Sequence, residues 1–166
     1  MTHRKLPNSK NYLLCVRTKK RYRQKLTKLK VISKTIQLSS KGQDDVIDIT
    51  KQVSNIVKDS NIENGTVTIF VVGSTAAVTT IEYEPGLIND FPEMLSRIIP
   101  KNIEYEHDNT WHDGNGHSHV RASLVGPSLT VPIINGKLTL GTWQQIVLLE
   151  MDTRPRNRNL ILQIMS

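Results

Sequence analysis

The chain has 166 residues, 22 Lys and Arg against 15 Asp and Glu, a formal net charge of +7 and one cysteine. That length suits a single domain that can bury an ordinary core without disulfides or a structural metal. One cysteine excludes an internal disulfide framework, and no apolar run reaches the roughly 18 residues that a membrane span needs, so we expect a cytoplasmic protein with no membrane partner.

The positive charge is concentrated at the start of the chain. Residues 1–30 hold eleven Lys or Arg and no acidic residue; subtracting those eleven from the total of 22 leaves 11 basic residues against all 15 acidic ones, a net charge of −4. Such an arm could contact nucleic-acid phosphates non-specifically, yet its composition is more typical of a solvated tail or of an upstream extension of the reading frame. We therefore predict a disordered basic arm over residues 1–30, which folding does not need, and a single domain over residues 31–166.

The first half of the domain is predicted to be rich in strands. Alternating apolar and polar residues, or dense β-branched residues, indicate strands over residues 31–38, 45–49, 66–72 and 76–83. The last two segments are separated only by a Gly-Ser-Thr turn, so we expect them to be paired core strands. Glu82 lies at the end of the fourth segment and would need a metal, a base or a bound ligand as partner if it faced inward.

Two helices are predicted among these strands. Thr50 fits an N-cap position, and apolar residues three and four apart indicate a helix that runs from there to about Asp59. The second helix is expected over residues 90–99, after Pro85 ends the preceding strand and before Pro100.

The C-terminal half is predicted to be mostly antiparallel sheet. Apolar segments separated by turn residues indicate strands over residues 120–124, 129–134, 137–140, 144–151 and 160–165. Asn135-Gly136 is a strong signal for a tight hairpin. The predicted fold is therefore α+β, mostly antiparallel β-sheet of a sandwich-like or barrel-like kind, with two helices.

The segment over residues 104–128 is the first candidate for chemistry. It contains His107, His112, His117 and His119, interleaved with Asp, Asn and Gly, a mixture that favours a liganding loop over a packed helix. Neutral imidazole and carboxylate are ligands that zinc prefers. If the chain enters a strand near His117, then His117 and His119 project from the same face and could reach one ion. The alternative is a polar surface loop whose histidines are solvated.

Four motifs in order carry a family resemblance: Phe70-Val-Val-Gly-Ser-Thr-Ala-Ala-Val-Thr-Thr-Ile-Glu, Tyr105-Glu-His-Asp, His119-Val-Arg-Ala-Ser-Leu-Val-Gly-Pro-Ser-Leu-Thr-Val-Pro and Gly136-Lys-Leu-Thr-Leu-Gly-Thr-Trp-Gln. In them the chain resembles the YjbQ family, from about Val31 to the C-terminus. The resemblance implies an α+β domain dominated by antiparallel strands and usually assembled as a homotrimer. Family members are described as secondary thiamine-phosphate synthases, which join hydroxymethylpyrimidine pyrophosphate to thiazole phosphate and release pyrophosphate.

The resemblance also implies site residues. By position, His107 and His119 match the family's histidines, Glu82 matches the glutamate after the Ala-Ala-x-Thr strand, and Gln144 matches the glutamine after Gly-Thr-Trp. Where many members carry a histidine before the Thr-Thr-Ala-Ala segment, this chain has Gly73. We hypothesise that His117 supplies the missing ligand, with His112 as the alternative.

The expected site therefore combines catalytic Glu82, Gln144 and Arg121 with the metal ligands His107, His117 and His119. Its metal is a divalent ion, zinc first and magnesium second, and its substrate is a small phosphorylated molecule. Departure of pyrophosphate builds negative charge, which the ion and Arg121 could stabilise. Arg121 could instead form an ion pair at a trimer interface.

The function expected from this site is a metal-dependent, thiamine-phosphate synthase-type transferase. One alternative is a non-catalytic trimeric protein that binds a metal or a ligand. A third hypothesis, ranked last, is nucleic-acid binding through the basic arm.

Overall fold

The computed structural model describes residues 29–166. The arm predicted over residues 1–30 lies outside the described residues, except for Leu29 and Lys30. Lys30 and Ser166 exchange backbone hydrogen bonds at N···O distances of 2.9 and 3.1 Å. Strand pairing therefore begins one residue before the predicted start of the domain.

Eight strands and four helices follow one another within residues 29–166. They are β1 (Val31–Ser39), β2 (Asp45–Asp48), α1 (Thr50–Asp59), β3 (Asn64–Val71), β4 (Ala76–Ile81), α2 (Pro85–Ile98), α3 (Glu106–Trp111), α4 (Gly116–Val125), β5 (Ser128–Ile134), β6 (Lys137–Leu138), β7 (Gln145–Glu150) and β8 (Asn157–Met165). In this part of the chain, no helix is both long and apolar enough to cross a membrane.

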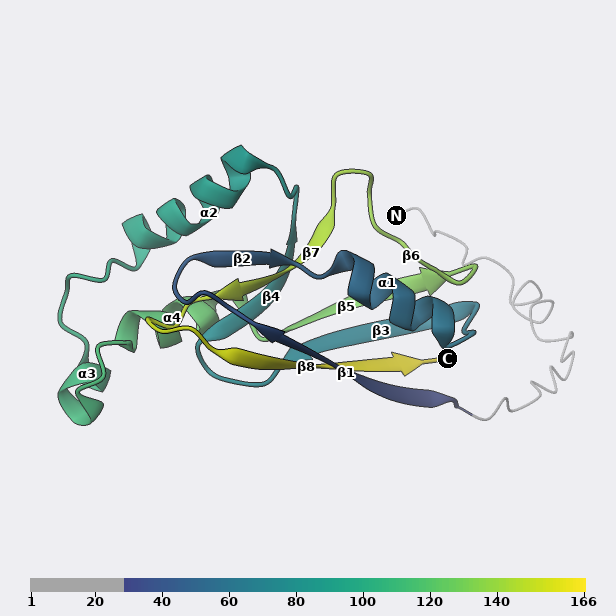
Figure 1. Ribbon diagram of the computed structural model, residues 1–166, viewed down its shortest axis with the longest axis horizontal. Helices are drawn as coiled ribbons and strands as arrows, with labels where there is room; N and C mark the ends of the chain where they lie inside the picture. Colours follow the sequence, from purple (N-terminus) through teal and green to yellow (C-terminus); the bar gives the residue numbers. More distant parts are fainter. Residues whose placement is uncertain (1–28) are drawn as a thin grey trace, which may run out of the picture.

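The strands form a five-stranded sheet in the order β1-β8-β3-β5-β6 and a three-stranded sheet in the order β2-β7-β4 (Figure 1). Every strand pair is antiparallel. The predicted α+β fold of mostly antiparallel sheet is confirmed. The described residues form four helices where two were predicted.

The predicted pairing of the two central strands with each other is wrong. β3 pairs with β5 and β8, whereas β4 pairs with β7 in the other sheet. The connecting loop carries Gly73 at a φ of +137°, and there the chain passes from one sheet to the other. Burial explains the error: Ala76, Ala77 and Val78 are buried in succession, as in a strand covered on both faces, so β4 belongs to an inner layer.

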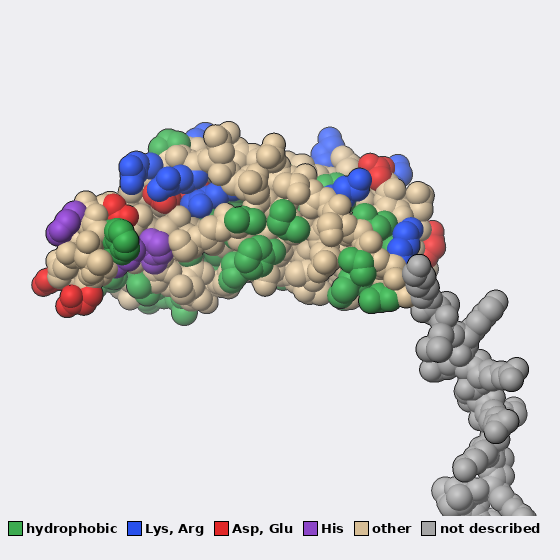
Figure 2. All heavy atoms as spheres, turned by 90° about the horizontal axis from the view of Figure 1, so that it is seen from below, with side chains coloured by type: hydrophobic (Ala, Val, Ile, Leu, Met, Phe, Trp, Pro, Cys, Tyr) green, Lys and Arg blue, Asp and Glu red, His purple; other side chains and the backbone are tan. Residues whose placement is uncertain are grey.

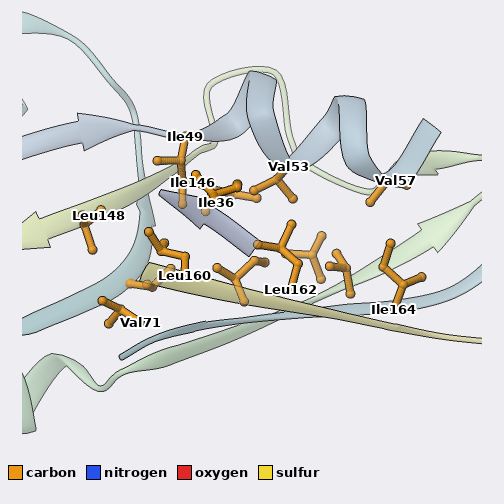
Figure 3. Close-up of a cluster of buried hydrophobic side chains, with 14 of the residues drawn as sticks. Ile36, Ile49, Val53, Val57, Val71, Ile146, Leu148, Leu160, Leu162 and Ile164 are labelled. Carbon is orange, nitrogen blue, oxygen red and sulfur yellow. The ribbon is translucent and has the colours of Figure 1, made fainter. Parts of the chain in front are cut away.

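The main core lies between the five-stranded sheet, the three-stranded sheet and α1 (Figure 3). Leu160, Leu162 and Ile164 point into it from β8, and Val53 and Val57 point into it from α1. Burying one such aliphatic side chain contributes roughly 1.5–3 kcal/mol. The sequence predicted a strand here because the apolar segment of residues 160–165 follows a run of turn residues.

A second apolar cluster covers the other face of the three-stranded sheet. There Ala77 of β4 and Leu149 of β7 pack in one cluster with Leu95 of α2 and Ala122 of α4. The contact fixes α4 against β4, and α4 carries residues of the candidate site described below.

The starts of both predicted helices differ from the prediction, and carboxylates accept hydrogen bonds near each of them. Thr50 is the first residue of α1 and not its N-cap, and its backbone N–H donates to Asp48 Oδ1 at 2.8 Å. α2 begins at Pro85, ahead of the predicted 90–99, because Glu84 accepts hydrogen bonds from two backbone N–H groups of its first turn. Proline suits the first helical position, where its missing N–H costs nothing.

The Asn135-Gly136 hairpin is confirmed. Both residues have positive φ, 52° and 71°, as a tight two-residue turn of type I′ requires. Ile134 pairs with Lys137 across it, but β6 has only two residues.

The histidine segment is helical, and the strand predicted over residues 120–124 is wrong. Gly116 N donates to Asp108 Oδ1 at 2.8 Å and ties the start of α4 to α3. The buried side of α4 includes His117 and Arg121, two polar residues four apart. Because polar residues occupy positions that are usually apolar, the segment lacks the hydrophobic periodicity of an amphipathic helix.

Candidate functional site

A polar cleft of about 350 Å³ lies where the β3–β4 loop, the start of α4 and the β7–β8 turn meet. The loop contributes residues 73–75, α4 and its N-cap contribute His119 and Asn115, and the turn contributes Asp152 and residues 156–158. Figure 2 shows basic side chains gathered beside histidines at one end of the molecule. We call this space the cleft.

Arg158 forms the floor of the cleft and is only 7% exposed. Its Nε donates to Glu150 Oε2 at 2.7 Å, and its Nη2 donates to Glu150 Oε1 and, at 2.8 Å, to Thr75 Oγ1. Its Nη1 makes no hydrogen bond to any residue within 29–166. A Cβ at Gly73 would lie 2.8 Å from Nη1, so glycine at this position keeps the space over that nitrogen open.

A second ion pair adjoins the first. Asp152, 1% exposed, accepts from Thr75 Oγ1 at 3.0 Å and from Arg156 Nε and Nη2 at 2.9 and 2.8 Å. Burial alone would raise the pKa of Asp152, but hydrogen bonds from Arg156 and Thr75 outweigh it, and the net shift is downward. Asp152 is thus ionised at neutral pH, and its carboxylate faces the guanidinium group of Arg156.

The backbone of the β3–β4 loop also offers donors. The N–H groups of Gly73, Ser74 and Thr75 make no hydrogen bond to any described residue. Successive free N–H groups of this kind commonly bind anions. Gly73 and Ser74 are exposed, so their N–H groups lie where a ligand can reach them, whereas Thr75 is only 5% exposed.

The structure brings His107 and His119 together, as the resemblance implied. Their ring centroids are 4.3 Å apart, and His107 Nε2 lies 3.5 Å from Asp113 Oδ1. Burial, followed by the neighbouring His107, lowers the pKa of His119 below its ordinary value of 6.5. His119 therefore presents a neutral imidazole to the cleft at neutral pH.

His117 and His112 lie elsewhere. Two helical positions differ by about 200° in direction, so His117 and His119 do not share a face of α4. His117 is 3% exposed, and its Nε2 lies 3.1 Å from the Gln43 amide nitrogen. His112 is exposed and ends α3 in the left-handed conformation, with a φ of 54°.

The expected zinc shell does not fit this arrangement. Over residues 29–166, no three His, Cys, Asp or Glu side chains are grouped as a metal site. A zinc site takes at least three protein ligands, and with His117 turned away the predicted set is reduced to His107 and His119. No chemical step is therefore assigned to a metal.

The three predicted catalytic residues do not line the cleft. Glu82 is exposed at the end of β4, and Gln144 pins its own loop by accepting from Gly141 N at 3.1 Å and donating to Thr80 Oγ1 at 3.0 Å. Arg121 is 0% exposed, and its Nε and Nη2 donate to the Ile99 carbonyl oxygen at 3.0 and 2.8 Å. Arg121 is therefore a buried residue whose hydrogen bonds connect α4 to the end of α2.

Sequence reasoning missed the residues that build the cleft floor. Glu150 ends an otherwise apolar strand and Asp152 follows two residues later, so both needed cationic partners if buried. Arg156, in the turn after β7, and Arg158, the second residue of β8, supply them. The sequence does show these two acidic and two basic residues close together. They indicate buried ion pairs only if the segments before and after the turn are both known to be buried.

The chain matches the family model described as UPF0047 protein YjbQ-like over residues 34–166. A UPF0047 protein of Methanothermobacter thermautotrophicus is 39% identical over 132 residues, which cover 80% of this chain and 90% of that protein. The UPF0047 protein YugU of Bacillus subtilis is 34% identical over 135 residues, covering 80% of this chain and 98% of that protein. A YbjQ-like protein of unknown function from Sulfolobus solfataricus has a TM-score of 0.78 at 34% identity, covering 84% of this chain and 99% of that one.

These comparisons correct the predicted function. The names of the relatives give a family of unknown function, with no thiamine-phosphate synthase and no metal among them. The prediction of a metal-dependent, thiamine-phosphate synthase-type enzyme is therefore wrong. Neither a non-catalytic trimeric metal-binding role nor nucleic-acid binding gains support from those names.

Proposed function

This chain belongs to the YjbQ-like UPF0047 family, and the names of the members above state no activity. We propose from the geometry of the cleft that the protein binds a small phosphorylated ligand there. The observation that carries the proposal is the guanidinium of Arg158. It is buried, held on one side by Glu150 and Thr75, and leaves Nη1 free toward the open space over Gly73.

A fixed donor of this kind suits phosphate recognition. Guanidinium N–H groups form strong, directional hydrogen bonds to phosphate oxygens, and a side chain already held in place loses little conformational freedom when it binds. The free N–H groups of Gly73, Ser74 and Thr75 add donors along one rim, and His119 adds a neutral ring at another.

The charge balance sets the expected strength. The two guanidinium groups of the floor are matched by Glu150 and Asp152, so the cleft offers many donors but little net positive charge. We therefore expect binding that depends more on hydrogen-bond geometry than on long-range attraction, and that weakens only moderately with added salt.

Assembly as a homotrimer in the cytoplasm is part of the proposal. The outer face of the five-stranded sheet exposes Val31, Phe70, Val72, Ile134 and Met165, each at least 38% accessible. Figure 2 shows hydrophobic side chains gathered in groups on one face of the molecule. Apolar groups on a sheet face support self-association, and the single cysteine supports a reducing compartment.

The test is calorimetric titration of the protein with inorganic phosphate. Arg158→Lys keeps a positive charge for Glu150 but replaces the guanidinium group by a single ammonium nitrogen, so the free Nη1 donor is lost. Phosphate affinity should therefore fall at least about tenfold. Arg97→Lys, at an exposed position of α2, is the matched control and should bind as the wild type does. Absence of saturable binding by the wild type, or equal binding by Arg158→Lys, would overturn the proposal.

A further inference from the structure

A second, smaller hollow adjoins the cleft. It has a volume of about 130 Å³ and shares Gly73, Ser74 and His119 with the cleft. Its remaining walls are Ala76, Ala122 and Pro127, with Ser123 also lining it. No charged side chain lines this hollow, in contrast to the cleft. We call it the side hollow.

The side hollow is built from fixed parts. Ala76 is 1% exposed at the start of β4, and Ala122 is 4% exposed on the inner side of α4. The end of α4 is tied down on both sides: Val78 N donates to Gly126 O at 3.1 Å, and Val71 N donates to Pro127 O at 2.9 Å. The walls are thus backbone-anchored and do not need to form when a ligand arrives.

The two spaces differ in what they can hold. An anion in the side hollow would lose water without gaining a charged partner, which is unfavourable, whereas the cleft also offers the guanidinium groups of Arg156 and Arg158. Taking about 30 Å³ for each water-sized group, the side hollow holds roughly four non-hydrogen atoms. It suits a short, uncharged organic group.

We propose that the ligand is a phosphate monoester of a short, uncharged organic group, with the phosphoryl group in the cleft and the organic group in the side hollow. The ester bond then lies beside Gly73, Ser74 and His119, the three residues that line both spaces. This inference rests on the proposed phosphate site and adds the class of ligand.

The test compares inorganic phosphate, propyl phosphate and naphthyl phosphate by calorimetric titration. Three buried carbons should make propyl phosphate bind at least about fivefold more tightly than inorganic phosphate, and the naphthyl group should be too large for the side hollow, so that naphthyl phosphate gains no such advantage. Ser123→Leu fills the side hollow from an exposed position of α4, so it should remove the preference for propyl phosphate and leave inorganic phosphate binding unchanged. Asn55→Leu, on α1 and lining neither space, is the control and should keep the preference.

The outcomes separate the two proposals. Wild-type protein that binds phosphate but does not prefer propyl phosphate overturns the side-hollow inference alone. A preference that survives Ser123→Leu overturns it too. Wild-type protein that binds none of the three compounds overturns the phosphate site and the inference together.

Discussion

The buried ion pair with Arg158 at the cleft floor makes the fold sensitive to truncation of Glu150. Its carboxylate is 1% exposed, accepts from Ser40 Oγ at 2.8 Å and pairs with Arg158. Glu150→Ala leaves a buried guanidinium without its counter-charge, which should lower the free energy of unfolding by about 3–5 kcal/mol. Urea unfolding measures this change.

The control for that substitution is an exposed ion pair. Glu93 and Arg97 lie 3.6 Å apart on α2 with side chains 65% and 66% exposed, so Glu93→Ala should leave the unfolding midpoint nearly unchanged. Similar losses for the two variants would show that the Glu150 pair is not a structural element of the floor.

His117 should make the fold sensitive to mild acid. Burial, followed by the charges of Arg121 and Lys101, lowers the pKa of His117 below 6.5. The unfolded chain therefore takes up the proton first. The contribution to stability is fully present above about pH 6.5 and is lost as the pH falls from there toward the folded-state pKa.

His117→Gln should flatten the dependence of the free energy of unfolding on pH in the range below about pH 6.5. His112→Gln, at an exposed position, should keep the wild-type slope. Urea unfolding at a series of pH values measures this dependence. If the free energy of unfolding of His117→Gln changes with pH as steeply as that of the wild type, His117 is not its source.

At the level of elements, the sequence predicted strands well and the histidine segment poorly. In β8, Leu160, Leu162 and Ile164 are fully buried and the residues between them, Ile161 and Gln163, are more exposed, as a strand with one face on the core requires. α4 buries His117 and Arg121, whose burial depends on Gln43 and Ile99 from distant segments. The pairing of β3 and β4 failed for a related reason, because local sequence does not say that a short loop changes sheets.

Close contact between α3 and α4 depends on glycine at position 116. A Cβ there would lie 2.5 Å from Tyr105 Cβ, and no rotation of the tyrosine side chain moves that atom away. Gly116→Ala should therefore shift α4 away from α3 and lower the free energy of unfolding by about 1–3 kcal/mol. Amide hydrogen exchange should become faster in both helices. Gly141→Ala, where the nearest contact would be an ordinary 3.8 Å, should change neither quantity. Unchanged exchange in Gly116→Ala would show that the two helices are not packed as described.

For the whole molecule, homotrimer assembly is the expectation to test. Sedimentation equilibrium at micromolar concentration should return about three times the 18.8 kDa chain mass. Phe70→Glu combined with Val72→Glu places charges on the outer sheet face and should shift the protein to smaller species. Ile98→Glu, exposed on α2, should assemble normally. A monomeric wild type would remove the proposal.

Fold and function were predictable to different extents at this scale. Period-two patterns and family motifs were enough for the α+β class, and the motif match singled out His107 and His119, whose ring centroids lie 4.3 Å apart in the structure. The cleft could not be predicted, because Thr75, Glu150 and Arg158 meet only when two sheets are stacked. Arg121 was predicted to be catalytic from its charge alone, because the sequence does not show that its side chain is buried.

The central claim is that the cleft over Arg158 binds phosphate, and the most direct measurement is a nitrogen–proton NMR titration with inorganic phosphate. We expect saturable shifts confined to the backbone amides of residues 73–75 and the side-chain Nε–H signal of Arg158, with no such shifts in Arg158→Lys. Saturable shifts centred elsewhere, or none at the amides of the β3–β4 loop, would contradict it.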